Sequence, residues 1–359
     1  MADGKASSLL KPLPMKGGDG TYSYSKNSTY QREGLMVTKE AVNEAISKLL
    51  DISNTSNTIR IADLGCSTGP NTYIAVQNII EAVQKKHALK GLSTTEFQVF
   101  FNDLPTNDFN TLYASLPPEN QYFTAGVPGS FHSRLFPESS IDIMHASYAL
   151  CWLSQVPIEV ENKQSPAWNR GKIFYSTSSD EVAEAYAAQF AKDVNNFLNA
   201  RAKEIVVGGL LLPVIPAIPQ GFHRSKTAIG FTFDAIGSVL MDMANDGIIS
   251  EAQVDSFNLP YYITTPDEMV NLVERNGCFS IEMMKTPDPF VFKNQPINAK
   301  ENNSHLRAAF EWLIAEHFGS SVVDQLFERI DQNEGFYSKL DASYSKVLLL
   351  LALKRKGQN

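Results

Sequence analysis

Short apolar runs alternate with longer amphipathic segments along the chain, as in a sheet covered by helices. The β-branched run Ile59–Asp63 predicts a strand, and helical periodicity follows from about Thr72 to His87. Further apolar runs predict strands at 97–101, 141–146, 210–214, 279–284 and 346–353, and helical patterns cover 35–52, 180–204, 224–253, 266–276, 302–318 and 322–333. This order predicts an α/β fold.

Turn signals interrupt the pattern at two places. Gly126–Phe131 predicts a turn between strands. Pro213, Pro216 and Pro219 predict an abrupt end to the strand at Leu210–Val214, because proline cannot donate to a strand ladder. We therefore expect the chain to leave the sheet after that strand.

The pattern divides the chain into four parts. Residues 1–31 are rich in Gly, Ser, Tyr and Lys, which suits either a flexible tail or an arm folded over a site. Residues 32–214 form the predicted core, 215–275 a helical insertion, and 276–359 the last strands with a second helical insertion at about 300–335.

A glycine-containing turn follows the strand at Ile59–Asp63. Its spacing, Asp-x-Gly-x-Ser-x-Gly, fits neither the dinucleotide fingerprint nor a phosphate-binding P-loop. Gly65 and Gly69 let the backbone approach a ligand closely, and the helix that follows favours an anionic group; a purely structural turn is the alternative. Asp103 ends the next strand, where it suits either the two hydroxyls of a ribose or a helix cap.

The composition of the chain limits the binding partners and the cellular location that we expect. The 359 residues are 43% apolar, enough for a sizeable core, and the net charge of −8 argues against nucleic acid or an anionic membrane as a partner. Three widely spaced cysteines suit free thiols in a reducing compartment. Since no leader-like segment opens the chain and the longest apolar run, Val347–Leu353, is too short to span a bilayer, we expect a soluble cytosolic protein.

Seven segments together resemble one family, the plant SABATH methyltransferases, which methylate small acids or, in one branch, purine nitrogens from S-adenosylmethionine. The matching segments begin at Met15-Lys-Gly-Gly, Asn27-Ser, Ala62-Asp-Leu-Gly-Cys-Ser-Thr-Gly-Pro-Asn, Phe101-Asn-Asp-Leu, Val127-Pro-Gly-Ser-Phe, Ser147-Tyr and Asp255-Ser-Phe-Asn-Leu-Pro. The resemblance implies a Rossmann-like class I methyltransferase sheet with an α-helical cap, and a homodimer.

The resemblance also implies site residues. Gln31 and Trp152 are the expected catalytic positions, donating to an acceptor oxygen, and the N-terminal arm becomes a lid; the residues alone leave Trp152 open as a core side chain. The implied cofactor-binding residues are Tyr24, Ser28, Asp63, Gly65, Cys66, Asn71, Asp103, Leu104, Ser130, Phe131 and Ser147. The implied substrate-binding residues are Lys16, Gln31, Tyr148, Cys151, Trp152, Phe233 and Tyr261.

Four residues match a magnesium position noted in some members of the family. They are Asn169, Asp255, Phe257 through its carbonyl group, and Asn258. Oxygen ligands suit a hard cation, but a set with one carboxylate makes a weak site. A structural turn is the alternative.

The acceptor that we expect follows from substrate-pocket positions at which this chain differs from its nearest branch of the family. The arm, the 254–260 segment and the C-terminal end look most like the loganic acid branch, with farnesoic and salicylic acid carboxyl methyltransferases nearby. Where that branch carries two His and a Gln, this chain has Cys151, Phe233 and Tyr261. We therefore expect a more apolar terpenoid, aromatic or alkaloid-derived acid, with loganic acid as a lesser candidate; an acidic enol, a xanthine nitrogen or a non-catalytic binder are the alternatives.

Overall fold

The strands form one mixed sheet at the centre of the protein. The computed structural model describes residues 13–51, 57–92, 95–287, 299–333 and 347–357. In these residues the strand order is β3-β2-β1-β4-β5-β7-β6, with β1 to β5 parallel and β7 antiparallel to both neighbours. The strands are β1 (Thr58–Leu64), β2 (Glu96–Asp103), β3 (Phe123–Pro128), β4 (Ile141–Ser147), β5 (Ile205–Ala217), β6 (Phe279–Lys285) and β7 (Val347–Arg355).

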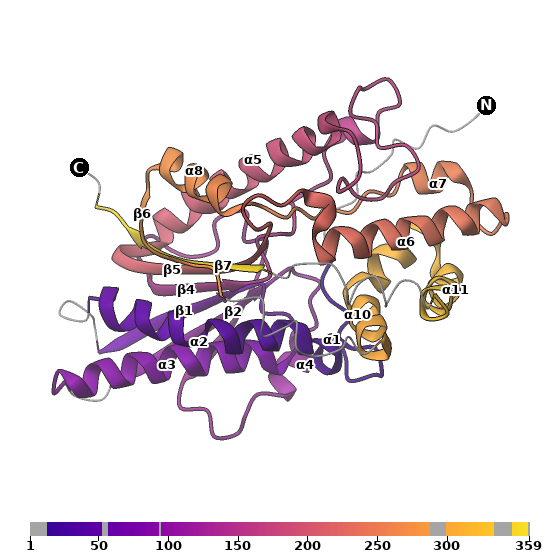
Figure 1. Cartoon of the computed structure of the whole chain (residues 1–359). Helices are drawn as coiled ribbons and strands as arrows, with labels where there is room; N and C mark the ends of the chain where they lie inside the picture. Colours follow the sequence, from indigo (N-terminus) through magenta and orange to yellow (C-terminus); the bar gives the residue numbers. More distant parts are fainter. Residues whose placement is uncertain (1–12, 52–56, 93–94, 288–298, 334–346, 358–359) are drawn as a thin grey trace.

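Helices cover both faces of this sheet (Figure 1). Helices α2 (Thr29–Leu49) and α3 (Pro70–Leu89) lie on one face, and α5 (Asp180–Glu204) and α8 (Pro266–Asn276) on the other. Successive residues of a strand point to opposite faces, and along β1 Ile59 and Ile61 join the core beside α3 while Ala62 and Leu64 join the core beside α5. Both faces are buried, which explains why β1 reads as an almost continuous apolar run.

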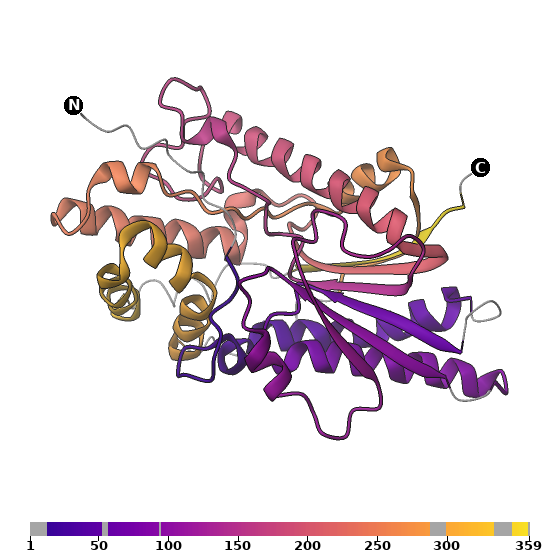
Figure 2. The same ribbon diagram turned by 180° about the vertical axis from the view of Figure 1, so that it is seen from behind.

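A second group of helices lies beyond one end of the sheet (Figures 1 and 2). It contains α6 (Ala228–Asn245), α7 (Glu251–Asp255), α10 (Ala299–Phe318) and α11 (Ser320–Asp331). Thr227 caps α6 by accepting from the Gly230 amide at 3.0 Å. The short elements α1 (Tyr24–Asn27), α4 (Phe109–Ala114), η1 (Ile158–Val160) and η2 (Arg224–Lys226) complete the described secondary structure.

The structure corrects two details of the predicted strands. Gly126–Pro128 is the end of β3, paired with β2, so the expected turn begins only at Gly129. Strand β5 continues through Pro213 and Pro216 to Ala217. Pro216 is tolerated because β4 ends opposite Val214, which leaves that part of β5 with β7 as its strand partner. Pro213 lies within the paired part, opposite Ala146 of β4.

Other predicted elements are confirmed closely. Helices α5 and α8 have the predicted bounds, and α10 and α11 match the two late helical segments to within three residues. The predicted α/β sheet covered by helices is confirmed as well. Among the described residues, no helix has the length and apolar character needed to cross a membrane.

Candidate active site

A large cavity opens where the parallel strands end. The residues that directly follow β1, β3 and β4, together with Asp103 at the end of β2, form its floor, and α6, α10 and the arm before α1 supply its other walls. Its empty volume is about 1320 Å³, which includes the open mouth and the solvent in it. The lining joins the end of the sheet to α6 and α10, so one cavity reaches both regions.

Twelve of the predicted site residues line this cavity. Gln31 and Trp152, the two expected catalytic residues, are among them. The other ten are Tyr24, Gly65, Asp103, Leu104, Ser130, Phe131, Ser147, Tyr148, Phe233 and Tyr261. The six that lie outside the lining are Lys16, Ser28, Asp63, Cys66, Asn71 and Cys151.

The glycine turn after β1 is held against the end of β2. The amides of Gly65 and Cys66 both donate to the Asn102 carbonyl, at 2.9 and 3.0 Å. Gly65 has a φ of +77°, and a Cβ built on it would lie 2.6 Å from that of Ala149. Only glycine therefore fits this close approach between the two cavity-lining segments.

Asp103 is fixed by main-chain amides at the edge of the cavity. Its Oδ2 accepts from the Ser67 amide at 2.8 Å and its Oδ1 from the Leu104 amide at 2.7 Å. Burial raises the pKa of Asp103 to about 6, and the nearby Asp63 adds to the rise while the two amides oppose it. An acceptor of this kind suits a pair of ligand hydroxyl groups.

Asp63, which lies in β1 just before the glycine turn, is held by side chains. Its Oδ1 lies 2.7 Å from His145 Nδ1, and its Oδ2 accepts from the Thr72 hydroxyl at 2.5 Å. Asn71 donates to the Ser28 carbonyl at 3.0 Å and accepts from Arg32 Nε at 3.2 Å. Asp63 and Asn71 thus connect the glycine turn to β4 and to the start of α2.

Several buried polar atoms around this end have no hydrogen-bond partner among the described residues. They include the hydroxyl groups of Ser67 and Ser147 and the Gln31 Oε1 atom, whose residues line the cavity, and the hydroxyl groups of Ser28 and Thr68 beside it. Buried polar groups are nearly always satisfied in native proteins. These atoms therefore suit a polar ligand, and the donor set fits the ribose and amino acid groups of S-adenosylmethionine.

The loop after β3 carries Ser130 and Phe131 and is fastened at both ends. Asn102 donates to the Val127 and Gly129 carbonyls at 2.7 and 2.9 Å. Arg201, fully buried on α5, donates to the carbonyls of Phe131 and Ser133, both at 2.9 Å, and pairs with Glu204 at 2.7 Å. A buried pair of this kind costs desolvation energy, so its use here indicates that the loop position matters.

The other end of the cavity is aromatic. The Trp152 ring lies edge-on to Tyr261 with centroids 5.1 Å apart, and 5.7 Å from Phe310 of α10. Phe233 of α6 contacts both Tyr261 and Phe310, at 5.4 and 5.1 Å. These rings make a wall with few hydrogen-bonding groups, which suits an apolar molecule.

Tyr148 stands between the two ends in an uncommon conformation. Its φ of 56° is left-handed, which is unusual for a bulky residue. Its ring lies 5.5 Å from that of Tyr30, and a Cβ on Gly34 would come within 2.3 Å of its hydroxyl oxygen. The absence of a side chain at position 34 therefore makes room for Tyr148.

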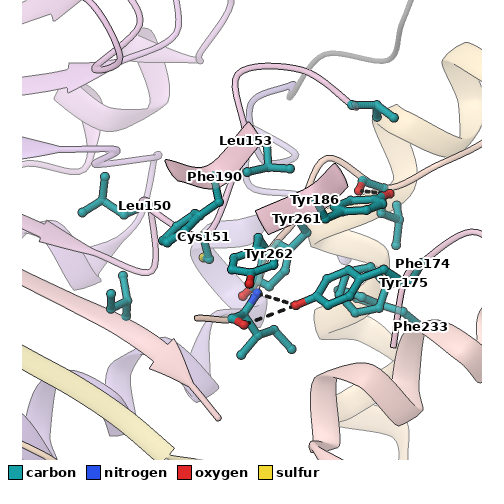
Figure 3. Close-up of a cluster of buried hydrophobic side chains, with 14 of the residues drawn as sticks. Leu150, Cys151, Leu153, Phe174, Tyr175, Tyr186, Phe190, Phe233, Tyr261 and Tyr262 are labelled. Carbon is teal, nitrogen blue, oxygen red and sulfur yellow. Dashed lines mark hydrogen bonds between the residues drawn. The ribbon is translucent and has the colours of Figure 1, made fainter. Parts of the chain in front are cut away.

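A buried aromatic cluster behind the cavity supports the segment that carries Tyr261 (Figure 3). The Tyr175 hydroxyl donates to the Ile263 carbonyl at 3.2 Å and accepts from the Ile263 amide at 3.0 Å. The Tyr186 hydroxyl donates to the Leu259 carbonyl at 3.1 Å. These bonds fix the cavity wall from behind.

Two expected substrate residues are occupied elsewhere. Lys16 forms an ion pair with Glu311 of α10 at 2.7 Å, and its amide donates to the Ala308 carbonyl. The buried Cys151 thiol donates to the Tyr148 carbonyl at 3.2 Å, and burial raises its pKa to about 12. Lys16 thus fastens the arm to α10, and Cys151 packs behind the wall as a neutral thiol.

The expected magnesium position is already satisfied by protein groups. Asn169 accepts from the Ser178 hydroxyl at 2.6 Å and donates to Asn258 Oδ1 at 2.8 Å, while Asp255 accepts from the Gly171 amide at 2.8 Å. Among the residues that the structure describes, no cluster of three His, Cys, Asp or Glu side chains could hold a metal. Asn169, Asp255 and Asn258 thus have hydrogen-bond partners within the protein, as expected of a structural turn.

Several cavity residues were not predicted from the sequence. His132 directly follows Phe131, and because Phe131 was predicted to bind the cofactor, His132 could have been predicted to lie near the cavity as well. The wall supplied by α10 had no such signal, because its residues show only the pattern of an amphipathic helix. The unexpected lining residues include Tyr30, His132, Thr232, Asn302, His305, Leu306 and Phe310.

The comparisons with known proteins agree with this geometry. A family model described as SAM dependent carboxyl methyltransferase matches residues 10–356. A loganic acid O-methyltransferase of Catharanthus roseus is 46% identical, over 96% of this chain and 94% of that protein. A farnesoic acid carboxyl-O-methyltransferase of Arabidopsis thaliana is 41% identical, over 88% of this chain and 90% of that protein.

A solved structure gives the same result in three dimensions. A loganic acid methyltransferase with SAH superposes with a TM-score of 0.93 at 45% sequence identity, covering 96% of this chain and 99% of that one. The likeness includes the sheet and the helices beyond its end.

Proposed function

Because the chain belongs to the family of S-adenosylmethionine-dependent carboxyl methyltransferases, we propose that it forms the methyl ester of a small, mainly apolar carboxylic acid. The observation that carries this proposal is a single cavity with a polar end and an aromatic end, lined by both Gln31 and Trp152. S-adenosylmethionine supplies an electrophilic methyl group when bound.

In this proposal the polar end holds the cofactor. Asp103 accepts from the ribose hydroxyl groups, and Leu104 and Phe131 enclose the adenine while Ser130 bonds to its edge. The buried hydroxyl groups of Ser67 and Ser147 complete the polar contacts. Asp63 and Asn71 act from outside the lining by fixing the glycine turn and the start of α2.

Gln31 and Trp152 then hold the acceptor carboxylate. A carboxylic acid is ionised near neutral pH, so its oxygen already carries the lone pair that attacks, and no residue has to remove a proton. Neutral donors orient this anion without pairing it with a full charge. The rate enhancement would come from Gln31 and Trp152 holding the acceptor oxygen toward the methyl group that the cofactor supplies, and from the aromatic wall excluding water.

The wall also defines the acceptor class. Phe233, Tyr261 and Phe310 offer ring faces and edges to the bound acid. A sugar placed against them would leave hydroxyl groups unsatisfied, which strongly disfavours binding. A terpenoid, aromatic or alkaloid-derived acid fits this wall better than glycosylated loganic acid.

Methyl transfer to a panel of acids tests this function. Labelled S-adenosylmethionine is incubated with salicylic, cinnamic, indole-acetic, jasmonic, farnesoic and loganic acids, an acidic enol and xanthine, and extractable product is counted. We expect label in one or more apolar acids, lost in Gln31→Ala and Trp152→Ala. Label only in loganic acid would overturn the apolar class, and label only in the enol or xanthine would overturn carboxyl methylation.

Three further properties belong to the proposal. We expect a homodimer in the cytosol, which size-exclusion chromatography and cell fractionation would test. We expect turnover to be unchanged by EDTA, because Asn169, Asp255 and Asn258 already bond to protein groups. Activity that EDTA removes and magnesium restores would contradict this.

A further inference from the structure

His132 lies between the two ends of the cavity. Its ring contacts that of Phe131 with centroids 4.5 Å apart, and its Nε2 lies 3.2 Å from the carbonyl oxygen of Trp152. It therefore contacts a residue at the polar end and the main chain of a residue at the aromatic end. His132 also lines the cavity itself.

The hydrogen bond defines the tautomer of this histidine. A carbonyl oxygen only accepts, so Nε2 carries the proton and donates it to Trp152. Burial lowers the pKa of His132 below its ordinary value, with Arg201 adding to this, while Asp193 and the Trp152 carbonyl oppose the shift. The main chain of Asp193 also lies beside the ring, and no hydrogen bond of normal geometry reaches the buried Nδ1 from the described residues.

Hydrogen bonds hold the main chain of the two segments that His132 joins, the loop after β3 and the segment around Trp152. Arg201 donates to the carbonyls of Phe131 and Ser133, on either side of His132. On the Trp152 side, the Leu153 amide donates to the Pro260 carbonyl at 2.9 Å. The imidazole thus joins the two segments directly.

Asp193 supports the same segment from α5. It accepts from the Ser154 amide at 2.8 Å and from the Ser154 hydroxyl at 2.7 Å, and Gln189 donates to it at 3.0 Å. The chain after Trp152 is therefore also held at Ser154 by a residue of α5. This leaves the Trp152 carbonyl as the point at which the loop after β3 acts on the acceptor end.

We propose that His132 is a positioning residue that couples cofactor binding to the orientation of Trp152. A ligand packed against Phe131 sets the position of the adjoining His132 ring, and the Nε2–H bond then holds Trp152 where its indole meets the acceptor. This inference rests on the proposed function for its acceptor step. It predicts that each ligand strengthens the binding of the other, because such coupling is reciprocal.

The test uses Trp152 as a fluorescent reporter. The chain has three tryptophans, so Trp168→Phe and Trp312→Phe leave Trp152 alone, in positions outside the cavity lining. In this background His132→Phe keeps the ring and removes the donor, whereas His132→Gln keeps a donor. S-adenosylhomocysteine should shift the Trp152 emission with His132 or Gln at this position, and the shift should be absent with Phe.

Calorimetry measures the coupling directly. The affinity for S-adenosylhomocysteine is determined with and without the acid identified in the panel. One net hydrogen bond corresponds to about a fivefold change, so the acid should tighten binding by about fivefold with His or Gln and leave it unchanged with Phe. Equal coupling and equal emission shifts in all three proteins would overturn the proposal.

Two results keep this inference separate from the proposed function. Should no acid be methylated, an emission shift on S-adenosylhomocysteine that depends on a donor at position 132 would still support the coupling. Should His132→Phe not fold, the test uses only the protein that retains His132. If S-adenosylhomocysteine leaves the Trp152 emission of that protein unchanged, the proposal is overturned, even if the protein forms the ester.

Discussion

The two ends of the cavity are built in different ways. At the polar end, Asp103 and the glycine turn belong to the sheet edge, and main-chain amides fix their positions. At the aromatic end, Phe233, Tyr261 and Phe310 come from segments far apart in the chain, and they are held by packing. The difference indicates that the polar end depends on single hydrogen bonds and the aromatic end on shape.

Removing the Asp103 carboxylate should have the largest effect on the polar end. Hydrogen bonds to charged groups contribute about 1.5–3 kcal/mol, so Asp103→Asn should weaken S-adenosylmethionine binding by about 10–100-fold. The acceptor KM at saturating cofactor should stay close to that of the unchanged protein. A matching rise in the acceptor KM would break the division into two ends.

The same residue gives the polar end a pH dependence. Burial raises the pKa of Asp103 in the ligand-free protein to about 6, and only the carboxylate can accept both ribose hydroxyl groups. Cofactor affinity should therefore fall as pH decreases through about 6, while Asp103→Asn should show no such step. Because the folded pKa is raised, this group makes the ligand-free fold more stable below pH 4 than above pH 6. Isothermal titration from pH 5 to pH 8 measures the binding step.

Filling the space beside Tyr148 should mainly affect the aromatic end. The Cβ of Gly34→Ala would lie 2.3 Å from the Tyr148 hydroxyl oxygen, and overpacking of this kind costs about 1–3 kcal/mol. We expect the free energy of unfolding to drop by that amount and the acceptor KM to rise about tenfold. Tyr148→Phe removes the nearest atom, so the double variant should recover part of both losses. A double variant no better than Gly34→Ala would contradict this.

The polar end of the cavity could be predicted from the sequence better than the aromatic end, because the two ends are built differently. The polar end was predictable because a strand, a glycine turn and an acid lie in short segments, as Gly65 and Asp103 show. Phe310 was not, because nothing local distinguishes a cavity-lining ring on α10 from a core ring. Lys16 was expected at the substrate, yet Glu311 lies close enough to pair with it. In the sheet, six of the seven strands followed from the hydrophobic pattern, whereas β3 was missed because its second half reads as a turn. Pro216 misled because its effect depends on where the neighbouring strand ends.

Changing the chemistry of the aromatic wall should alter acceptor choice by a smaller amount. Phe233→His and Tyr261→Gln add hydrogen-bonding groups that can meet a sugar. Each should raise kcat/KM for loganic acid relative to the preferred apolar acid by about 5–10-fold, which corresponds to about one satisfied hydrogen bond. Cofactor KM should not change. Phe233→Leu is the matched control, because it alters the ring without adding polarity, and an equal gain there would refute the argument.

The connection between the arm and α10 should have the smallest effect. Lys16 pairs with Glu311, which also accepts from Arg307 at 2.9 Å, and the Arg307 guanidinium lies 4.0 Å from the centre of the Tyr22 ring. These groups are partly exposed, and such pairs contribute about 0.2–1 kcal/mol. Glu311→Gln should raise KM for both ligands by about two- to fivefold, since the arm contacts both ends.

Glu44→Gln is the control. It removes an exposed ion pair of the same 2.7 Å length, between Glu44 and Lys48, away from the cavity. Equal KM changes in the two variants would show that the arm position does not depend on this network.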